Sequence, residues 1–209
     1  MSTEAWEIVK EIGVEDIEIQ LALQCAPLIT GLKISNLFRI QKEQYKKLLD
    51  IIQDSGIEIC PLGMIEDKIT VLLYRERALE AFLSGEQVRR LLKQFGYSGM
   101  ELKKILLTFR MHYQNYLKNK TSFPHEMGLL LGYPPEDVEG FVLHKGKQFL
   151  CMGDWKVYKN PAAKQRLFQK YDDTRENLVQ LLSHGITMEQ IIDICDGRMP
   201  RNIKNYNCI

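Results

Sequence analysis

The sequence predicts a predominantly helical α+β fold, in which helices pack on a small, mainly antiparallel sheet. Stretches with apolar residues three and four positions apart, typical of amphipathic helices, dominate the 209 residues. Short runs rich in β-branched and aromatic residues are few and clustered in the chain. These runs do not alternate one by one with the helices, which disfavours a doubly wound parallel sheet.

The first quarter of the chain should form two short helices, an extended segment and a longer helix. Ala5–Ile12 and Val14–Leu23 carry the helical spacing of apolar residues. Ala26-Pro27 is expected to stop or bend the chain, and Gly31–Phe38 follows as an extended segment. A clear amphipathic pattern predicts a helix over Gln41–Asp54.

A β-hairpin and three further helices are expected next. Ile57–Cys60 and Ile69–Arg75 read as strands, joined through a Pro61-Leu-Gly63 turn and the polar residues Glu66-Asp67-Lys68. The helical pattern then resumes in three stretches, Arg77–Leu83, Gly85–Phe95 and Ser98–Lys118.

In the last part of the chain, prolines indicate where helices begin. Pro124 and Pro134-Pro135 predict helices at about 124–131 and 135–144, because proline is tolerated in the first helical turn. The segments 148–152 and 155–158 form either a hairpin around a Gly153-Asp154 turn or one bulged strand. The last two helices are expected from Asn160-Pro161 to about Ser183 and over Met188–Asp193.

Size and composition indicate one domain. A chain of 209 residues with 45% hydrophobic and 26% charged residues can bury a sizeable core. We expect one α+β domain over residues 1–197 and a polar tail over 198–209.

Charge and cysteine usage narrow the classes of partner and compartment. The formal net charge of +1 supplies no global field toward nucleic acid or a membrane, so neither is expected as a partner. No apolar stretch is long enough to span a bilayer, and the N-terminus does not resemble a signal peptide. Five single cysteines without metal-ligand spacing indicate neither a disulfide framework nor a zinc site. The sequence therefore predicts a cytoplasmic protein.

Several short motifs together resemble one known family. They are Cys25-Ala-Pro27, Gly31-x-Lys33, Asn36-Leu-Phe38, Ser122-Phe-Pro-His-Glu-Met-Gly128, Leu131-Gly-Tyr-Pro134, Asp137-Val138 and Trp155-Lys-Val-Tyr158. The combination resembles an uncharacterised family of clostridia and related anaerobes, domain of unknown function 3793, which is marked by its Pro-His-Glu motif. The resemblance runs from about residue 16 to 180. It implies an anaerobic, cytosolic setting and a shared role for the motif residues, without giving a mechanism.

The Pro124-His125-Glu126 segment is the densest candidate for chemistry. With Pro124 at the first helical position, Glu126 would cap the helix, which is a structural role. A helix N-terminus also binds anions and favours a neutral histidine, so His125 is a candidate general acid or base. Both residues are retained as catalytic candidates.

Cys25 and several polar residues are conditional partners of His125. The Cys25 thiol would be a nucleophile only if a histidine or lysine stabilised its thiolate; burial is the alternative. In residues 155–158, strand alternation places Lys156 and Tyr158 on one face and Trp155 and Val157 on the other. An anion could be bound by side chains near the predicted strands, namely Lys33, Asn36, Arg75, Lys156 and Tyr158.

Two function classes remain open from sequence. The first is an enzyme acting on a small anionic metabolite through His125 and Cys25. The second is a non-catalytic accessory protein of anaerobic redox metabolism that binds a metal, haem or another ligand. No sequence motif for nucleotide binding, proteolysis or calcium binding is present. His112 is expected at the surface. The sequence determines neither a cofactor nor the oligomeric state.

Overall fold

The computed structural model describes residues 1–119 and 123–200. It confirms a mainly helical α+β fold with small antiparallel sheets. The larger sheet has the order β1-β3-β2, with β1 at Ser35–Gln41, β2 at Glu58–Ile65 and β3 at Lys68–Tyr74. Both strand pairs are antiparallel.

The predicted hairpin between β2 and β3 is present, but its turn differs from the expectation. Glu66 and Asp67 connect the strands, and Glu66 adopts a positive φ of 52°. Pro61-Leu-Gly63 lies inside β2 and forms a bulge opposite β3. Because Pro61 has no amide proton, it is tolerated on this edge strand at a bulge.

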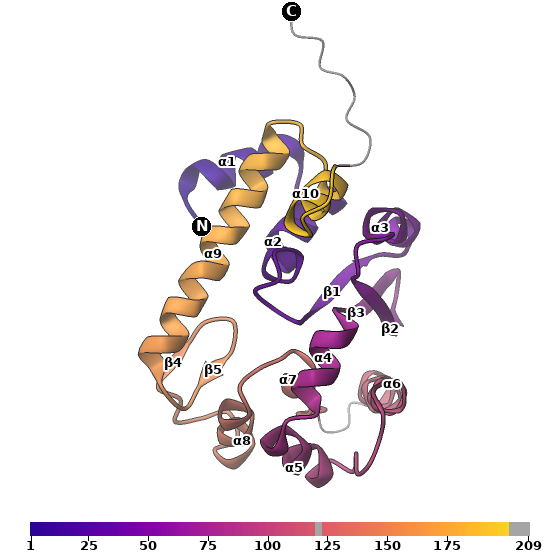
Figure 1. The fold of residues 1–209 in the computed structure, drawn as a ribbon, viewed down its shortest axis with the longest axis vertical. Helices are drawn as coiled ribbons and strands as arrows, with labels where there is room; N and C mark the ends of the chain where they lie inside the picture. Colours follow the sequence, from indigo (N-terminus) through magenta and orange to yellow (C-terminus); the bar gives the residue numbers. More distant parts are fainter. Residues whose placement is uncertain (120–122, 201–209) are drawn as a thin grey trace, which may run out of the picture.

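Helices cover both faces of this sheet (Figure 1). One face carries Phe38, Ile40, Val71 and Leu73, which pack in a core with residues of five helices. These helices are α1 at Thr3–Ile12, α2 at Ile17–Ile29, α3 at Tyr45–Ile52, α9 at Pro161–Ser183 and α10 at Met188–Cys195. A 3-10 turn, η1 at Lys42–Gln44, precedes α3.

A second core lies on the opposite face. Leu62 and Leu72 of the sheet pack there with residues of the middle helices. These are α4 at Glu76–Leu83, α5 at Glu86–Gln94, α6 at Leu102–Asn119, α7 at Met127–Leu130 and α8 at Pro135–Leu143. The alternation of side chains along the strands therefore divides the apolar residues between two cores.

A short hairpin lies between α8 and α9 in the chain. Its strands are β4 at Cys151–Met152 and β5 at Lys156–Val157, so the chain forms the hairpin rather than one bulged strand. Trp155 and Val157 pack against Phe168 and Tyr171 of α9 in a small third core. The predicted alternation is seen, since Trp155 and Val157 are buried while Lys156 is half-buried.

Two predicted helix boundaries are wrong. Helix α2 continues through Pro27 to Ile29, where its buried residues belong to the first core. The proline removes one backbone donor close to the helix end, and burial of this last turn outweighs that loss. Helix α7 begins at Met127 instead of Pro124 and is four residues long.

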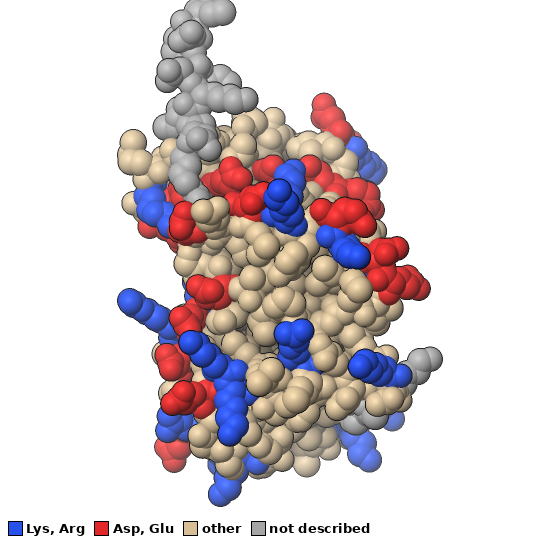
Figure 2. All heavy atoms as spheres, turned by 90° about the vertical axis from the view of Figure 1, so that its right-hand side faces the viewer, with Lys and Arg blue, Asp and Glu red and all other residues tan. Residues whose placement is uncertain are grey.

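Surface charge of both signs is visible on one side of the molecule. Figure 2 shows many acidic side chains toward the top of this face, basic and acidic ones mixed along its lower left edge, and a broad area with few charges at its centre. No single sign covers this face. None of the helices within residues 1–119 and 123–200 combines the length and apolar character that a membrane span requires. Most of the predicted tail, residues 201–209, lies outside the described residues.

Candidate functional site

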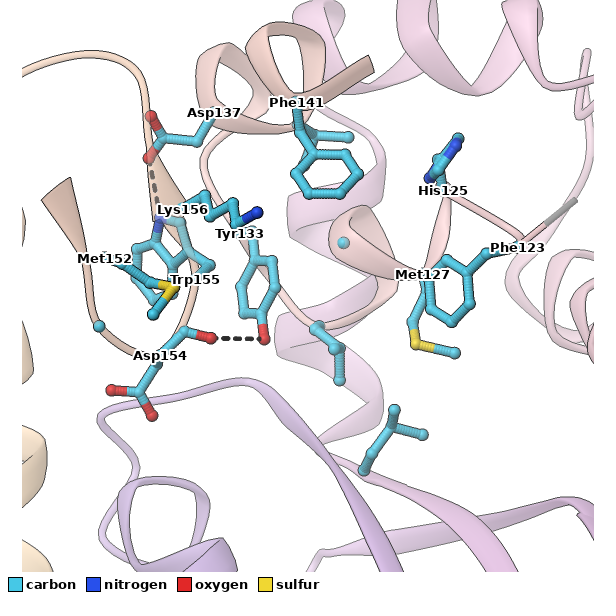
Figure 3. Close-up of a pocket in the computed structure, with 15 residues that line it drawn as sticks. Phe123, His125, Met127, Tyr133, Asp137, Phe141, Met152, Asp154, Trp155 and Lys156 are labelled. Carbon is cyan, nitrogen blue, oxygen red and sulfur yellow. Dashed lines mark hydrogen bonds between the residues drawn. The ribbon is translucent and has the colours of Figure 1, made fainter. Parts of the chain in front are cut away.

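A cavity of about 430 Å³ lies between the β4–β5 hairpin and the α7–α8 region. Its wall is mainly aromatic and apolar, as is typical of small-molecule sites. In Figure 3, one side carries Phe123, His125 and Met127, the other carries Met152, Asp154, Trp155 and Lys156, and Phe141 and Tyr133 lie between them.

Asp137 fixes the hairpin to α8. Its side chain is 2% exposed and accepts hydrogen bonds from three donors of the following segment. These are Trp155 Nε1 at 2.8 Å, the Tyr158 amide at 2.8 Å and the Lys159 amide at 3.2 Å. A buried carboxylate needs such partners, so these bonds determine where β5 lies relative to α8.

Aromatic rings pack between the β4–β5 hairpin and α9. The rings of Tyr133 and Trp155 stack with centroids 4.8 Å apart, and Phe168 meets Trp155 edge-on at 4.6 Å. The Tyr133 hydroxyl donates to the backbone carbonyl of Asp154 at 3.3 Å. This stack provides a rigid flat surface in the cavity wall.

Lys156 supplies the positive charge of the cavity. Its ammonium donates to the Gly146 carbonyl at 2.8 Å and lies 5.8 Å from the Phe141 ring centroid and 5.0 Å from that of Phe149. Asp137 is bonded as described above, and Asp154 pairs with Arg175. Among the described residues, no carboxylate lies within 4.0 Å of the Lys156 ammonium. The cavity thus contains a cation that has no carboxylate partner in the described part of the chain.

His125 lies across the cavity from Lys156 (Figure 3). Its ring stands 6.0 Å from that of Phe123 and 5.5 Å from that of Phe141. Its Nδ1 atom is buried and has no hydrogen-bond partner among the described residues. The sequence predicted that His125 lies at the anion-binding N-terminus of a helix. Instead, α7 starts two residues later and forms about one turn, so His125 lies in a turn.

Glu126 turns away from the cavity and does not cap α7. Its carboxylate Oε1 accepts from His112 Nδ1 at 2.8 Å and from the Tyr97 hydroxyl at 3.0 Å. The predicted capping role is therefore wrong. Sequence reasoning also missed His112 and Tyr97, which are 14 and 29 positions from Glu126 in the chain, too far for any local pattern to connect them.

Cys25, Lys33 and Asn36 form a second group, in which Cys25 and Lys33 are buried and Asn36 is half-buried. The Lys33 ammonium donates to Asn36 Oδ1 at 2.8 Å, and Asn36 Nδ2 donates to Cys25 Sγ at 3.5 Å. Burial raises the pKa of the Cys25 thiol from 9.0 to about 12, whereas burial lowers the pKa of Lys33 from 10.5 to about 8. The thiol is thus protonated near neutral pH, which argues against its use as a nucleophile. None of these three residues lines the cavity.

Arg75 and Tyr158 also lie outside the cavity wall. The Arg75 guanidinium donates to the Ile29 carbonyl and to Asp196, both at 3.0 Å, near the C-terminal end of α2. Tyr158 stacks on His144 at 5.6 Å between ring centroids. Of the site residues selected from the sequence, His125 and Lys156 line this cavity and the others do not. Within residues 1–119 and 123–200, no three His, Cys, Asp or Glu side chains are grouped so that they could hold a metal ion.

Comparison with known proteins supports the family resemblance. The sequence profile of a family described as protein of unknown function DUF3793 matches residues 21–192. Neither the curated proteins nor the solved structures give a significant match. Because the matched region covers most of the chain, this protein belongs to the DUF3793 family of proteins of unknown function.

Proposed function

We propose that the protein binds a small organic anion with a flat, largely apolar body in the cavity between the β4–β5 hairpin and α7–α8. The observation that carries this proposal is the ammonium of Lys156, which faces an aromatic cavity without a carboxylate partner among the described residues. A ligand anion would supply the missing negative charge in a setting that water screens less than the surface.

The shape and composition of the wall determine the rest of the ligand. About 430 Å³ is the size of a small-metabolite site, and the Tyr133–Trp155 stack offers a flat ring face. His125 on the opposite side would contact the end of the molecule away from Lys156. Carboxylate, sulfonate and phosphate groups all satisfy the ammonium, so the proposal names the anion class only.

Binding is better supported than the His125–Cys25 chemistry considered from sequence. Cys25 is fully buried and does not line the cavity, and the Nδ1 atom of His125 has no partner among the described residues that would orient the ring. The cytoplasmic setting and the link to anaerobic metabolism remain part of the proposal, supported by the sequence motifs and by the four cysteines of the described residues, which are free thiols.

Native mass spectrometry of protein purified without oxygen tests this function. We expect an added mass from an organic anion, retained in Lys147→Met and lost in Lys156→Met. Lys147 is an exposed residue outside the cavity wall, so its substitution removes the same charge without touching the site. An absorbing haem or a metal ion retained in both variants would instead favour the alternative class of metal- or haem-binding accessory proteins.

A further inference from the structure

A second cavity adjoins the first and contains a carboxylate–histidine pair. It is an open hollow of about 490 Å³ and shares Phe123 and His125 with the wall of the first cavity. His112 and Glu126 also line it. Phe123 and His125 thus stand between the two cavities, and a molecule that occupies both would pass them and reach His112.

The burial of the two partners is unequal. The side chain of Glu126 is 6% exposed, whereas that of His112 is 42% exposed. A carboxylate is acceptor-only, so His112 Nδ1 carries the proton of their 2.8 Å hydrogen bond. In the neutral ring the lone pair then lies on Nε2, on the opposite edge of the imidazole. Histidines that act as general bases are commonly oriented in this way, by a carboxylate that accepts a hydrogen bond from the other ring nitrogen.

Tyr97 holds the carboxylate in place. Its hydroxyl donates to the same oxygen, Glu126 Oε1, at 3.0 Å, and its ring meets the His112 ring edge-on with centroids 5.6 Å apart. Burial, and secondarily the negative charge of Glu126, raises the pKa of Tyr97, so the phenol keeps its proton and remains a donor. The Tyr97 hydroxyl and His112 Nδ1 thus both donate to one oxygen of the buried Glu126 carboxylate, which keeps this oxygen beside the His112 ring.

We propose that His112 is a general base, oriented by Glu126, for the molecule bound across the two cavities. A hydroxyl group of that molecule, or a water beside it, gives its proton to His112 Nε2. The O–H bond breaks, an N–H bond forms, and the electron pair stays on the oxygen. The Glu126 carboxylate stabilises the resulting imidazolium. This inference rests on the proposed function only for the identity of the molecule, and Glu126 acts as a positioning residue.

His184 provides an internal control for this chemistry. Its Nδ1 lies 2.7 Å from the Gln180 carbonyl, so it carries the proton on the same nitrogen but has a neutral partner. His184 is also the more accessible residue, being exposed where His112 is half-buried. Access alone would make His184 react faster, so a faster His112 reports the effect of its carboxylate.

The test is the rate of acylation by diethyl pyrocarbonate, whose carbonyl carbon is attacked by an unprotonated imidazole nitrogen. Peptide mass spectrometry measures this rate at one neutral pH. We expect His112 to react at least about tenfold faster than His184. Glu126→Gln should remove this advantage and leave His184 unchanged, whereas Glu126→Asp should retain part of it. A His112 rate no higher than that of His184, or one unaffected by Glu126→Gln in a folded variant, would overturn the proposal.

Three further measurements keep the outcome decisive. If Glu126→Gln does not fold, the imidazole ¹⁵N spectrum of the unmodified protein decides, because we expect the His112 proton on Nδ1, and a proton on Nε2 would overturn the proposal. Lys156→Met should leave His112 acylation unchanged, so failure of the anion site is distinguishable from failure of the base. Saturating anilinonaphthalene sulfonate should protect His112 but not His184; binding without protection would contradict a shared site.

Discussion

The indole nitrogen of Trp155 donates a 2.8 Å hydrogen bond to the buried carboxylate of Asp137. This bond joins the residue before β5 to α8, and residues of both elements line the first cavity. The position of Lys156, the next residue after Trp155, therefore depends on a carboxylate that itself makes no direct ion pair with the Lys156 ammonium.

Replacing Asp137 by alanine should destabilise the fold strongly. Three donors would lose their acceptor, and each buried orphan costs about 1–3 kcal/mol, so we expect the free energy of unfolding to fall by at least about 3 kcal/mol. Urea unfolding followed by Trp155 fluorescence in a Trp6→Phe background measures it. The control is Glu136→Ala, a half-buried carboxylate paired with Lys164, which should cost under about 1 kcal/mol. Equal losses would contradict the role of Asp137.

The Cys25 thiol should be unreactive in the folded protein. Burial raises its pKa to about 12, so almost no thiolate forms at neutral pH. Iodoacetamide labelling with peptide mapping should modify the exposed Cys195 long before Cys25, and Cys25 should react only after denaturation. Rapid labelling of native Cys25 would restore the nucleophile hypothesis.

Lys33 should make stability depend on pH in the alkaline range. Lowering its pKa from 10.5 to about 8 corresponds to about 3 kcal/mol of destabilisation at neutral pH. Between pH 8 and 10.5 the unfolded chain binds more protons than the folded one, so this penalty disappears as pH rises.

Lys33→Met removes the buried charge together with the hydrogen bond to Asn36. Removing the charge should raise the free energy of unfolding at pH 7 by up to about 3 kcal/mol, and losing the hydrogen bond should lower it by about 1 kcal/mol. We therefore expect the variant to be more stable than the original protein at pH 7. Urea unfolding between pH 7 and 10.5 should show this advantage shrinking as pH rises. A difference that is independent of pH would contradict the assignment.

Gly140 allows α8 to pack directly on Tyr158. A Cβ atom at this position would run into the Tyr158 ring, so Gly140→Ala should cost about 1–3 kcal/mol through overpacking despite a higher helix propensity. Thermal unfolding measures the effect. Glu139→Ala, at the neighbouring exposed position, should change stability by no more than about 0.5 kcal/mol. A stabilised Gly140→Ala variant would show that the helix and ring can separate at little cost.

Sequence patterns predicted those features that depend on neighbouring residues. The alternation in Trp155-Lys-Val-Tyr158 indicated which side chains would be buried, and Lys156 and His125, both selected from sequence, line the same cavity. Contacts between residues far apart in the sequence could not be predicted. The periodicity of apolar residues indicates which face of a helix or strand a side chain lies on, but not which distant residue it contacts. Glu126 contacts His112 of α6, and the proline of α2 stays helical because its turn is buried in a core that distant helices complete.

The most direct test of the anion site compares two fluorescent probes of the same shape, the anionic anilinonaphthalene sulfonate and the uncharged phenylnaphthylamine. In Lys156→Met, we expect the sulfonate to bind about tenfold more weakly, a change of about 1.4 kcal/mol, while the uncharged probe keeps its affinity within about twofold. Lys147→Met should change neither affinity. If Lys156→Met changed the affinity of both probes equally, or of neither, this result would contradict the account of the cavity as a site for an anion with a largely apolar body.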